Sequence, residues 1–92
     1  MLKLELKRQP FDFLSSLPAK QFRQVMMSVV YLLKNPYPQD AQKLKGYDFH
    51  RIDIGEYRIV YRIDDDTLCV TLIGKRNDDD IYRRLKRFLQ YQ

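Results

Sequence analysis

The chain has 92 residues, enough for one hydrophobic core, so we expect one domain over residues 1–92. Apolar residues make up 45% and charged residues 32%, a balance typical of folded proteins, and no apolar run reaches the roughly 18 residues that cross a membrane. The net charge of +5 favours a polyanionic partner, and the single cysteine, Cys69, excludes an intrachain disulfide and a cysteine-based metal site.

The N-terminal segment predicts a half-buried strand. Leucines at positions 2, 4 and 6 alternate with charged residues at 3, 5 and 7, and Pro10 ends the pattern. The same stretch lacks the apolar run of a signal peptide, so we expect a cytoplasmic protein that does not enter a membrane.

Two helices are expected next. Phe13, Leu14 and Leu17 form a short apolar stripe, and a second helix starts at Pro18 with Ser16 as its N-terminal cap. Its wide apolar face runs on until Asn35-Pro36 stops it.

After a polar link through Gln42, three strands are predicted to form an antiparallel meander. They cover Tyr47–Ile54, Tyr57–Ile63 and Thr67–Lys75, and are joined by short turns at Gly55-Glu56 and Asp64-Asp65-Asp66.

A helix closes the chain, capped by Asn77 or Asp78. Its apolar residues recur at helical spacing: Ile81, Leu85, Phe88 and Leu89. The order β-α-α-β-β-β-α predicts an α+β fold, with the helical hairpin on one face of a mostly antiparallel four-stranded sheet. We interpret the acids at positions 78–80 as offsetting the helix dipole and not as a metal site.

Alternation along the meander separates a core face from a basic face. Tyr57 and the residues in phase with it should point into the core, and Arg58 should point to the other side. Arg51 and Asp53 fall on the same outer surface as Arg58, and Arg76 follows the next strand closely enough to reach its edge.

These residues are also where the sequence resembles the RelE toxin family. The resemblance covers essentially the whole chain. The resemblance lies in Lys43-Leu44-Lys45-Gly46, His50-Arg51-Ile52, the run from Gly55 to Tyr61, and Gly74-Lys75-Arg76 followed by Tyr82. It implies the fold of small microbial ribonucleases and a metal-independent, cofactor-free endoribonuclease that cuts mRNA in the ribosomal A site. The substrate's 2′-hydroxyl would attack the adjacent phosphate to give a 2′,3′-cyclic phosphate and a 5′-hydroxyl. The implied partners are the small ribosomal subunit, mRNA and a RelB-like antitoxin that neutralises the toxin. A heterotetramer of toxin and antitoxin is one form that their complex could take.

The resemblance also implies roles for individual residues. Arg58 would clamp the scissile phosphate, Arg76 would stabilise the transition state, and Tyr82 would stack on a base. Arg51 would be a second phosphate contact. By spacing alone, Tyr82 could equally pack on the sheet edge. Further RNA contacts are expected from Lys45, Lys75, Arg83 and Arg87.

The proton acceptor is where this chain departs from the family pattern. The best-studied active sites have a lysine two residues after the position of Arg51, and this chain has Asp53. Asp53 could be the general base, or it could form an ion pair that orients an arginine. A histidine can also accept a proton, but alternation places His50 on the opposite face as a structural residue.

Two other functions stay open. The run from Tyr57 to Tyr61 is shared with ParE-like toxins, which poison DNA gyrase and do not cut RNA. A catalytically degenerate member that binds only an antitoxin or RNA is the third reading, because of Asp53.

Overall fold

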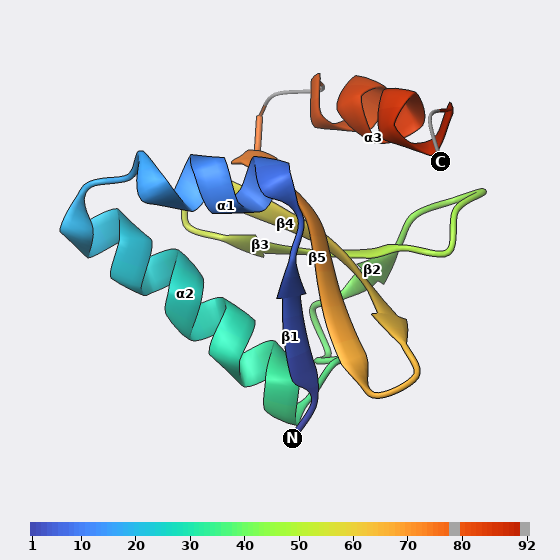
Figure 1. Ribbon diagram of the computed structural model, residues 1–92, viewed down its shortest axis with the longest axis horizontal. Coiled ribbons are helices and arrows are strands. Elements are labelled where there is room, and N and C mark those ends of the chain that lie inside the picture. Colours follow the sequence, from blue (N-terminus) through green and yellow to red (C-terminus); the bar gives the residue numbers. More distant parts are fainter. Residues whose placement is uncertain (78–79, 91–92) are drawn as a thin grey trace.

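A five-stranded sheet forms the centre of the molecule (Figure 1). The computed structural model describes residues 1–77 and 80–90. In chain order the elements are β1 (Lys3–Leu6), α1 (Arg8–Ser15), α2 (Ala19–Lys34), β2 (Gln42–Lys43), β3 (His50–Ile54), β4 (Tyr57–Asp64), β5 (Thr67–Lys75) and α3 (Asp80–Gln90).

The sheet order is β1-β5-β4-β3-β2, in which β1 runs parallel to β5 and the other pairs are antiparallel. The α+β class and the meander are confirmed. The prediction of four strands is wrong, because Gln42–Lys43, within the presumed polar link, pairs with β3 as a fifth strand. Two residues are too few to carry an alternating pattern.

The predicted cap at Ser16 is also wrong. The hydroxyl of Ser16 donates a hydrogen bond back to the carbonyl oxygen of Phe13 at 2.7 Å, and Pro18 stands at the N-terminus of α2 without a side-chain cap. A serine hydroxyl readily bonds the preceding turn, as here at the end of α1. The strand ends at Leu6, and Pro10 lies inside the first turn of α1, where a proline is tolerated. The predicted cap at Asp78 falls outside the described residues.

The hydrophobic residues form two clusters, one on each face of the sheet. On one face, α2 packs Val25, Val29 and Leu32 against a set that includes Ile59 and Tyr61. On the other, Ile81 and Leu85 of α3 pack against Leu44, Phe49, Val60 and Leu72. The register shifts at Val60/Tyr61, where Thr71 is the extra residue on β5. The result is three layers, with the outer face of the meander only partly covered by α3.

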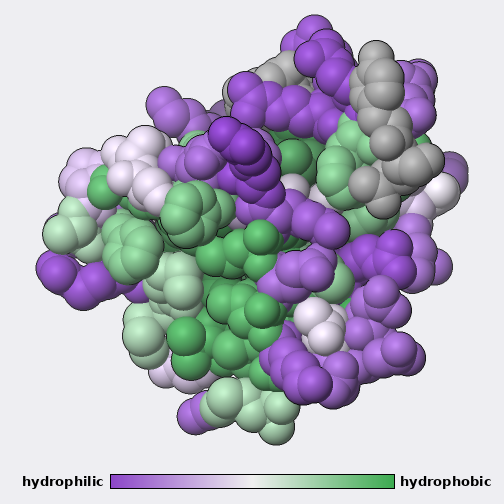
Figure 2. All heavy atoms as spheres, in the orientation of Figure 1, coloured by the Kyte–Doolittle hydropathy of each residue, from purple (hydrophilic) through white to green (hydrophobic). Residues whose placement is uncertain are grey.

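The distribution of apolar residues also bears on the surface and on membrane contact. Figure 2 shows apolar residues gathered over α2 and β1 on one side of the molecule, with hydrophilic residues around α3. Among the described residues, no helix combines the length and the apolar character that crossing a membrane requires.

Candidate functional site

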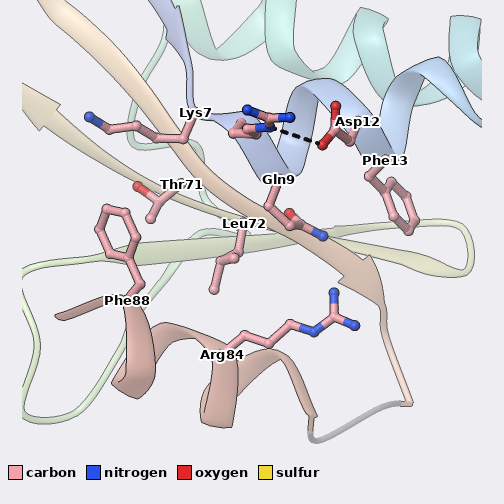
Figure 3. Close-up of a pocket in the computed structure, with 9 residues that line it drawn as sticks. Lys7, Gln9, Asp12, Phe13, Thr71, Leu72, Arg84 and Phe88 are labelled. Carbon is pink, nitrogen blue, oxygen red and sulfur yellow. Dashed lines mark ion pairs between the residues drawn. The ribbon is translucent and has the colours of Figure 1, made fainter. Parts of the chain in front are cut away.

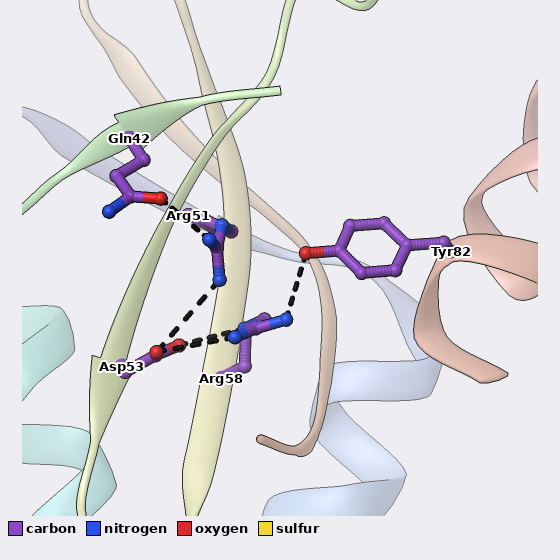
Figure 4. A network of polar contacts seen from close by, with 5 residues as sticks. All are labelled: Gln42, Arg51, Asp53, Arg58 and Tyr82. Carbon is purple, nitrogen blue, oxygen red and sulfur yellow. Dashed lines mark hydrogen bonds and ion pairs between the residues drawn. The ribbon is translucent and has the colours of Figure 1, made fainter. Parts of the chain in front are cut away.

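The outer face of the meander brings together four side chains that the sequence singled out. Arg51 and Asp53 on β3 lie on the same side as Arg58 on β4, and Asp53 is the cross-strand partner of Arg58 (Figure 4). Tyr82 reaches the same point from α3. The predicted clustering of Arg51, Asp53 and Arg58 is confirmed.

The guanidinium of Arg58 is held on two sides. Its Nε donates to Oδ1 of Asp53 at 2.8 Å and its Nη2 donates to Oδ2 at 3.3 Å, while Nη1 donates to the hydroxyl of Tyr82 at 2.8 Å. An arginine has five N–H groups, and within residues 1–77 and 80–90 one N–H on Nη1 and one on Nη2 have no hydrogen-bond partner, so a ligand can use them. The side chain is only 13% exposed, so that the site presents its charge in a fixed direction.

The charges in the site reinforce one another. The hydrogen bond from Arg58 is the main cause that lowers the pKa of Asp53; burial opposes it, and the charges of Arg58, Arg51 and Arg76 add to the lowering. The same hydrogen bond with Asp53 raises the pKa of Arg58. Both groups are therefore ionised at neutral pH, and Asp53 is a weaker base than an ordinary carboxylate.

Arg51 is tied down by a residue that the sequence did not single out. Its Nη2 donates to Oε1 of Gln42 at 2.6 Å, and its Nη1 lies 3.9 Å from Oδ2 of Asp53. Gln42 reaches Arg51 because β2 pairs the two residues directly. No local pattern marks a two-residue strand, so only the tertiary structure reveals this contact.

Gly74 allows α3 to approach the site. Gly74 lies opposite Arg58 on the neighbouring strand, and a Cβ there would sit 3.4 Å from Cδ1 of Ile81. Because Gly74 has no side chain, Ile81 of α3 packs directly over it. Tyr82, next to Ile81, packs half-buried at the edge of the α3 cluster and has its ring centroid 5.7 Å from Cζ of Arg58.

Arg76 stands where β5 ends. Its backbone N–H donates to the carbonyl oxygen of Glu56 at 2.7 Å, which ties this residue to the β3–β4 hairpin. Its side chain is exposed, and its charge contributes to the lowered pKa of Asp53, as expected for a residue at the rim of this site.

The remaining predicted RNA contacts are spread over the surface. Lys45 is exposed in the loop before β3, and Arg83 and Arg87 are exposed on α3. Lys75 pairs with Tyr57, whose side chain faces the helical hairpin, so the structure does not bring Lys75 to the face of Arg58.

His50 lies on the other face, as alternation predicts. Its ring stacks 5.9 Å from that of Tyr61 and lies 4.9 Å from that of Tyr37, measured between centroids. This position separates it from Arg58 by the thickness of the sheet. Within the described part of the chain, no three His, Cys, Asp or Glu side chains lie together as metal ligands would.

A hollow of about 590 Å³ lies apart from this site, between α1 and α3 (Figure 3). Its walls are largely apolar, from Phe13, Leu72 and Phe88. None of the sequence-predicted site residues lines it, so the polar cluster around Arg58 is the better candidate.

Solved structures of other proteins share this fold. No match is found among curated proteins. The archaeal RelE–RelB complex from Pyrococcus horikoshii contains a similar chain, with 25% identity, a TM-score of 0.73, and coverage of 83% of this chain and 96% of that chain. A mutant of the E. coli toxin RelE in the free state has 24% identity and a TM-score of 0.77, with 94% of this chain and 96% of that chain covered. The Mycobacterium tuberculosis toxin–antitoxin complex RelBE2 has 21% identity and a TM-score of 0.72, with 82% and 98% covered.

A family model described as the ParE toxin of type II toxin–antitoxin systems matches residues 6–80, most of the chain. That range includes Arg51, Asp53, Arg58 and Arg76, and ends just before Tyr82. The chain therefore belongs to the ParE toxin family of type II toxin–antitoxin systems, within the RelE/ParE superfamily, and has the fold of the RelE toxins.

Proposed function

We propose that the chain is a ribosome-dependent endoribonuclease that cuts mRNA in the A site and so inhibits translation. The observation that carries the proposal is the fixed orientation of Arg58, which keeps one N–H on each of Nη1 and Nη2 for a ligand. Two such donors match two oxygens of a phosphate.

The reaction needs no resident cofactor. The 2′-oxygen of the substrate ribose forms a bond to the adjacent phosphorus and loses its proton, while the bond to the 5′-oxygen breaks and that oxygen gains a proton. Arg58 holds the phosphate, and Arg76 and Arg51 add positive charge where the five-coordinate phosphorus becomes more negative. Only RNA supplies the 2′-hydroxyl.

Asp53 acts mainly as a positioning residue in this proposal. It accepts two hydrogen bonds from Arg58 and its pKa is lowered, which suits a group that orients a cation better than one that collects a proton. The general base is then water or a group of the ribosome, and Asp53 as the base is the alternative.

Tyr82 supplies the base contact. Its hydroxyl is bonded to Arg58, so a base that stacks on its ring would hold the nucleotide in line beside the clamped phosphate. Stacking of this kind contributes about 1–3 kcal/mol per base.

The proposed partners follow from the relatives. Several similar structures are complexes of a RelE toxin with a RelB antitoxin. We extend this to a cognate, RelB-like antitoxin here, which would cover the basic surface in a complex such as a heterotetramer. Lys45, Lys75, Arg83 and Arg87 would contact RNA of the small ribosomal subunit in the cytoplasm.

The nuclease proposal is tested in a translating extract, by mapping the 5′ ends of the mRNA fragments. Wild type should cut inside the A-site codon, and Arg58→Ala and Arg76→Ala should each reduce cutting about 10²-fold or more, as for the loss of one preorganised donor. Arg23→Ala is the matched control, because it removes an exposed arginine from α2, on the opposite face.

The second candidate is a gyrase poison, which the match to the ParE family model favours. Intact mRNA together with gyrase-dependent DNA breaks would replace the nuclease proposal by this one. Intact mRNA and intact DNA, with antitoxin binding retained, would identify a degenerate toxin.

A further inference from the structure

Strand β3 has an open edge beyond its short partner. β2 pairs only with His50 and Arg51, and within residues 1–77 and 80–90 no strand pairs with Asp53 or Ile54 on that side. Unpaired strand edges expose backbone polar groups that a ligand can use.

A pocket of about 340 Å³ lies over this edge, between it, the C-terminal half of α2 and residues 35–40. Its floor is apolar and includes Leu32, Ile52 and Ile54. Its rim carries the aromatic ring of Tyr31, which is 65% exposed, and groups that can hydrogen-bond or carry charge. These groups are Lys34, Asn35, Asp40 and Asp53.

The pocket connects with the arginine site. A second hollow of about 220 Å³ is lined by Asp40, Gln42, Arg51 and Asp53, and Asp40 and Asp53 line both hollows. The two hollows therefore adjoin, and together we call them the groove. The groove reaches Asp53, whose carboxylate accepts a hydrogen bond from Arg58 (Figure 4).

The charges along the groove select what can lie in it. Asp40 and Asp53 line both hollows, whereas Lys34 lines only the larger hollow and Arg51 only the smaller one. A phosphate beside the carboxylate of Asp40 would be repelled, whereas a neutral ring that donates an N–H would be attracted. A flat base that contacts an exposed tyrosine and an apolar floor meets both conditions.

We propose that this pocket binds the base of the nucleotide next to the scissile phosphate, stacked on Tyr31 and donating its exocyclic amino group to Asp40. The inference rests on the proposed function and adds a preference to it. Adenine, cytosine and guanine carry such an amino group. Uracil offers only its N3–H, which lies between two carbonyl oxygens that a carboxylate repels, so the cut should disfavour uridine at this position.

Two variants test the pocket, Tyr31→Ala and Asp40→Asn. Met27→Ala is the control, because Met27 is a large, 51% exposed residue of the same helix that lines neither hollow. Two non-cleavable 2′-O-methyl dinucleotides, one with cytidine and the other with uridine, are titrated against each protein to measure their affinity. Cut sites are mapped separately in a translating extract.

Wild type should bind the cytidine dinucleotide more tightly than the uridine one. Tyr31→Ala should weaken binding about tenfold, the effect of one lost stacking contact. Asp40→Asn should remove the preference between the two bases, and Met27→Ala should match wild type in both measurements.

Equal RNA affinity and equal cut sites for Tyr31→Ala and Met27→Ala, while wild type still cuts mRNA, would overturn the pocket and leave the proposed function standing. If Tyr31→Ala weakened only the binding of the antitoxin, the groove would be a protein contact and the inference would be wrong. A wild-type protein that neither binds nor cuts RNA would remove the proposed function, and this inference with it.

Discussion

The carboxylate of Asp53 lies alongside the guanidinium of Arg58 and accepts hydrogen bonds from both Nε and Nη2. The two residues face each other across β3 and β4, so the pair is set by strand register and not by a flexible loop. Arginine and aspartate thus behave as one unit.

Asp53→Asn and Asp53→Ala should differ in cleavage. Asparagine keeps a carbonyl oxygen that accepts from Arg58, so its rate should stay within about tenfold of wild type, whereas alanine releases Arg58 and should cost about 10²-fold. Single-turnover cleavage of ribosome-bound mRNA across pH measures this. Equal, severe loss in both variants would instead identify Asp53 as the general base.

The Asp53–Arg58 pair should also make stability depend on acid pH. Because the folded-state pKa of Asp53 is lowered, its contribution is present above the ordinary carboxylate range of roughly 4 and is lost as pH falls below it. Urea unfolding at neutral pH should find Asp53→Asn less stable than wild type, and the difference should shrink at about pH 3. A difference that stays constant would contradict the contribution of this ion pair.

Tyr82→Phe and Tyr82→Ala separate the ring from the hydroxyl. Phenylalanine keeps the stacking surface and loses the hydrogen bond with Arg58, so cleavage should fall only a few-fold, about the effect of one hydrogen bond. Alanine removes the stacking surface as well, and should raise KM for mRNA and lower kcat further. Equal activity of alanine and phenylalanine would show that the ring packs against the sheet and does not contact RNA.

Gln9 should be important for stability. Its carboxamide donates to the carbonyl oxygen of Ile73 at 2.8 Å and accepts from the N–H of Ile73 at 2.9 Å, in place of a neighbouring strand where β1 has ended. Gln9→Ala should lower the free energy of unfolding by about 1–3 kcal/mol, since both backbone groups lose their partner. Gln9→Glu should be destabilised at neutral pH, because a carboxylate has no proton to donate, and should recover in acid.

Gln90→Ala is the control for these two variants, because Gln90 is exposed on α3. Urea unfolding monitored by circular dichroism provides the measurement. Unfolding free energies of Gln9→Ala and Gln90→Ala that both equal the wild-type value would show that water replaces Gln9 without cost.

We expect Tyr61 to lose its proton at a higher pH than an ordinary tyrosine. Burial raises the pKa of Tyr61 to about 12, and its hydroxyl donates to the carbonyl oxygen of Pro36 at 2.6 Å. Because the folded pKa is raised, the contribution of Tyr61 to stability is complete below pH of about 10 and is lost as pH rises through about 12. An absorbance titration should find a late tyrosine that disappears in Tyr61→Phe; an unchanged titration curve in that variant would contradict the assignment.

Much of the fold follows from short-range patterns. Alternation gives the meander and places Arg51, Asp53 and Arg58 on one face, because successive side chains of a strand point to opposite sides. The same pattern places His50 on the other face, as observed. The helix starts are less well predicted, because a serine hydroxyl can bond backward as well as forward, as Ser16 does.

The sequence by itself determined the α+β class, the RelE/ParE superfamily and the basic face on which Arg58 lies. Only the tertiary structure decided how that face is organised: that Gln42 holds Arg51, and that Tyr82 meets Arg58 across 24 positions of the chain. The reason is physical. A face depends on residues two apart, whereas these contacts depend on a two-residue strand and on how closely α3 can pack over Gly74. Packing distances of that kind do not produce a periodic pattern of residues in the sequence.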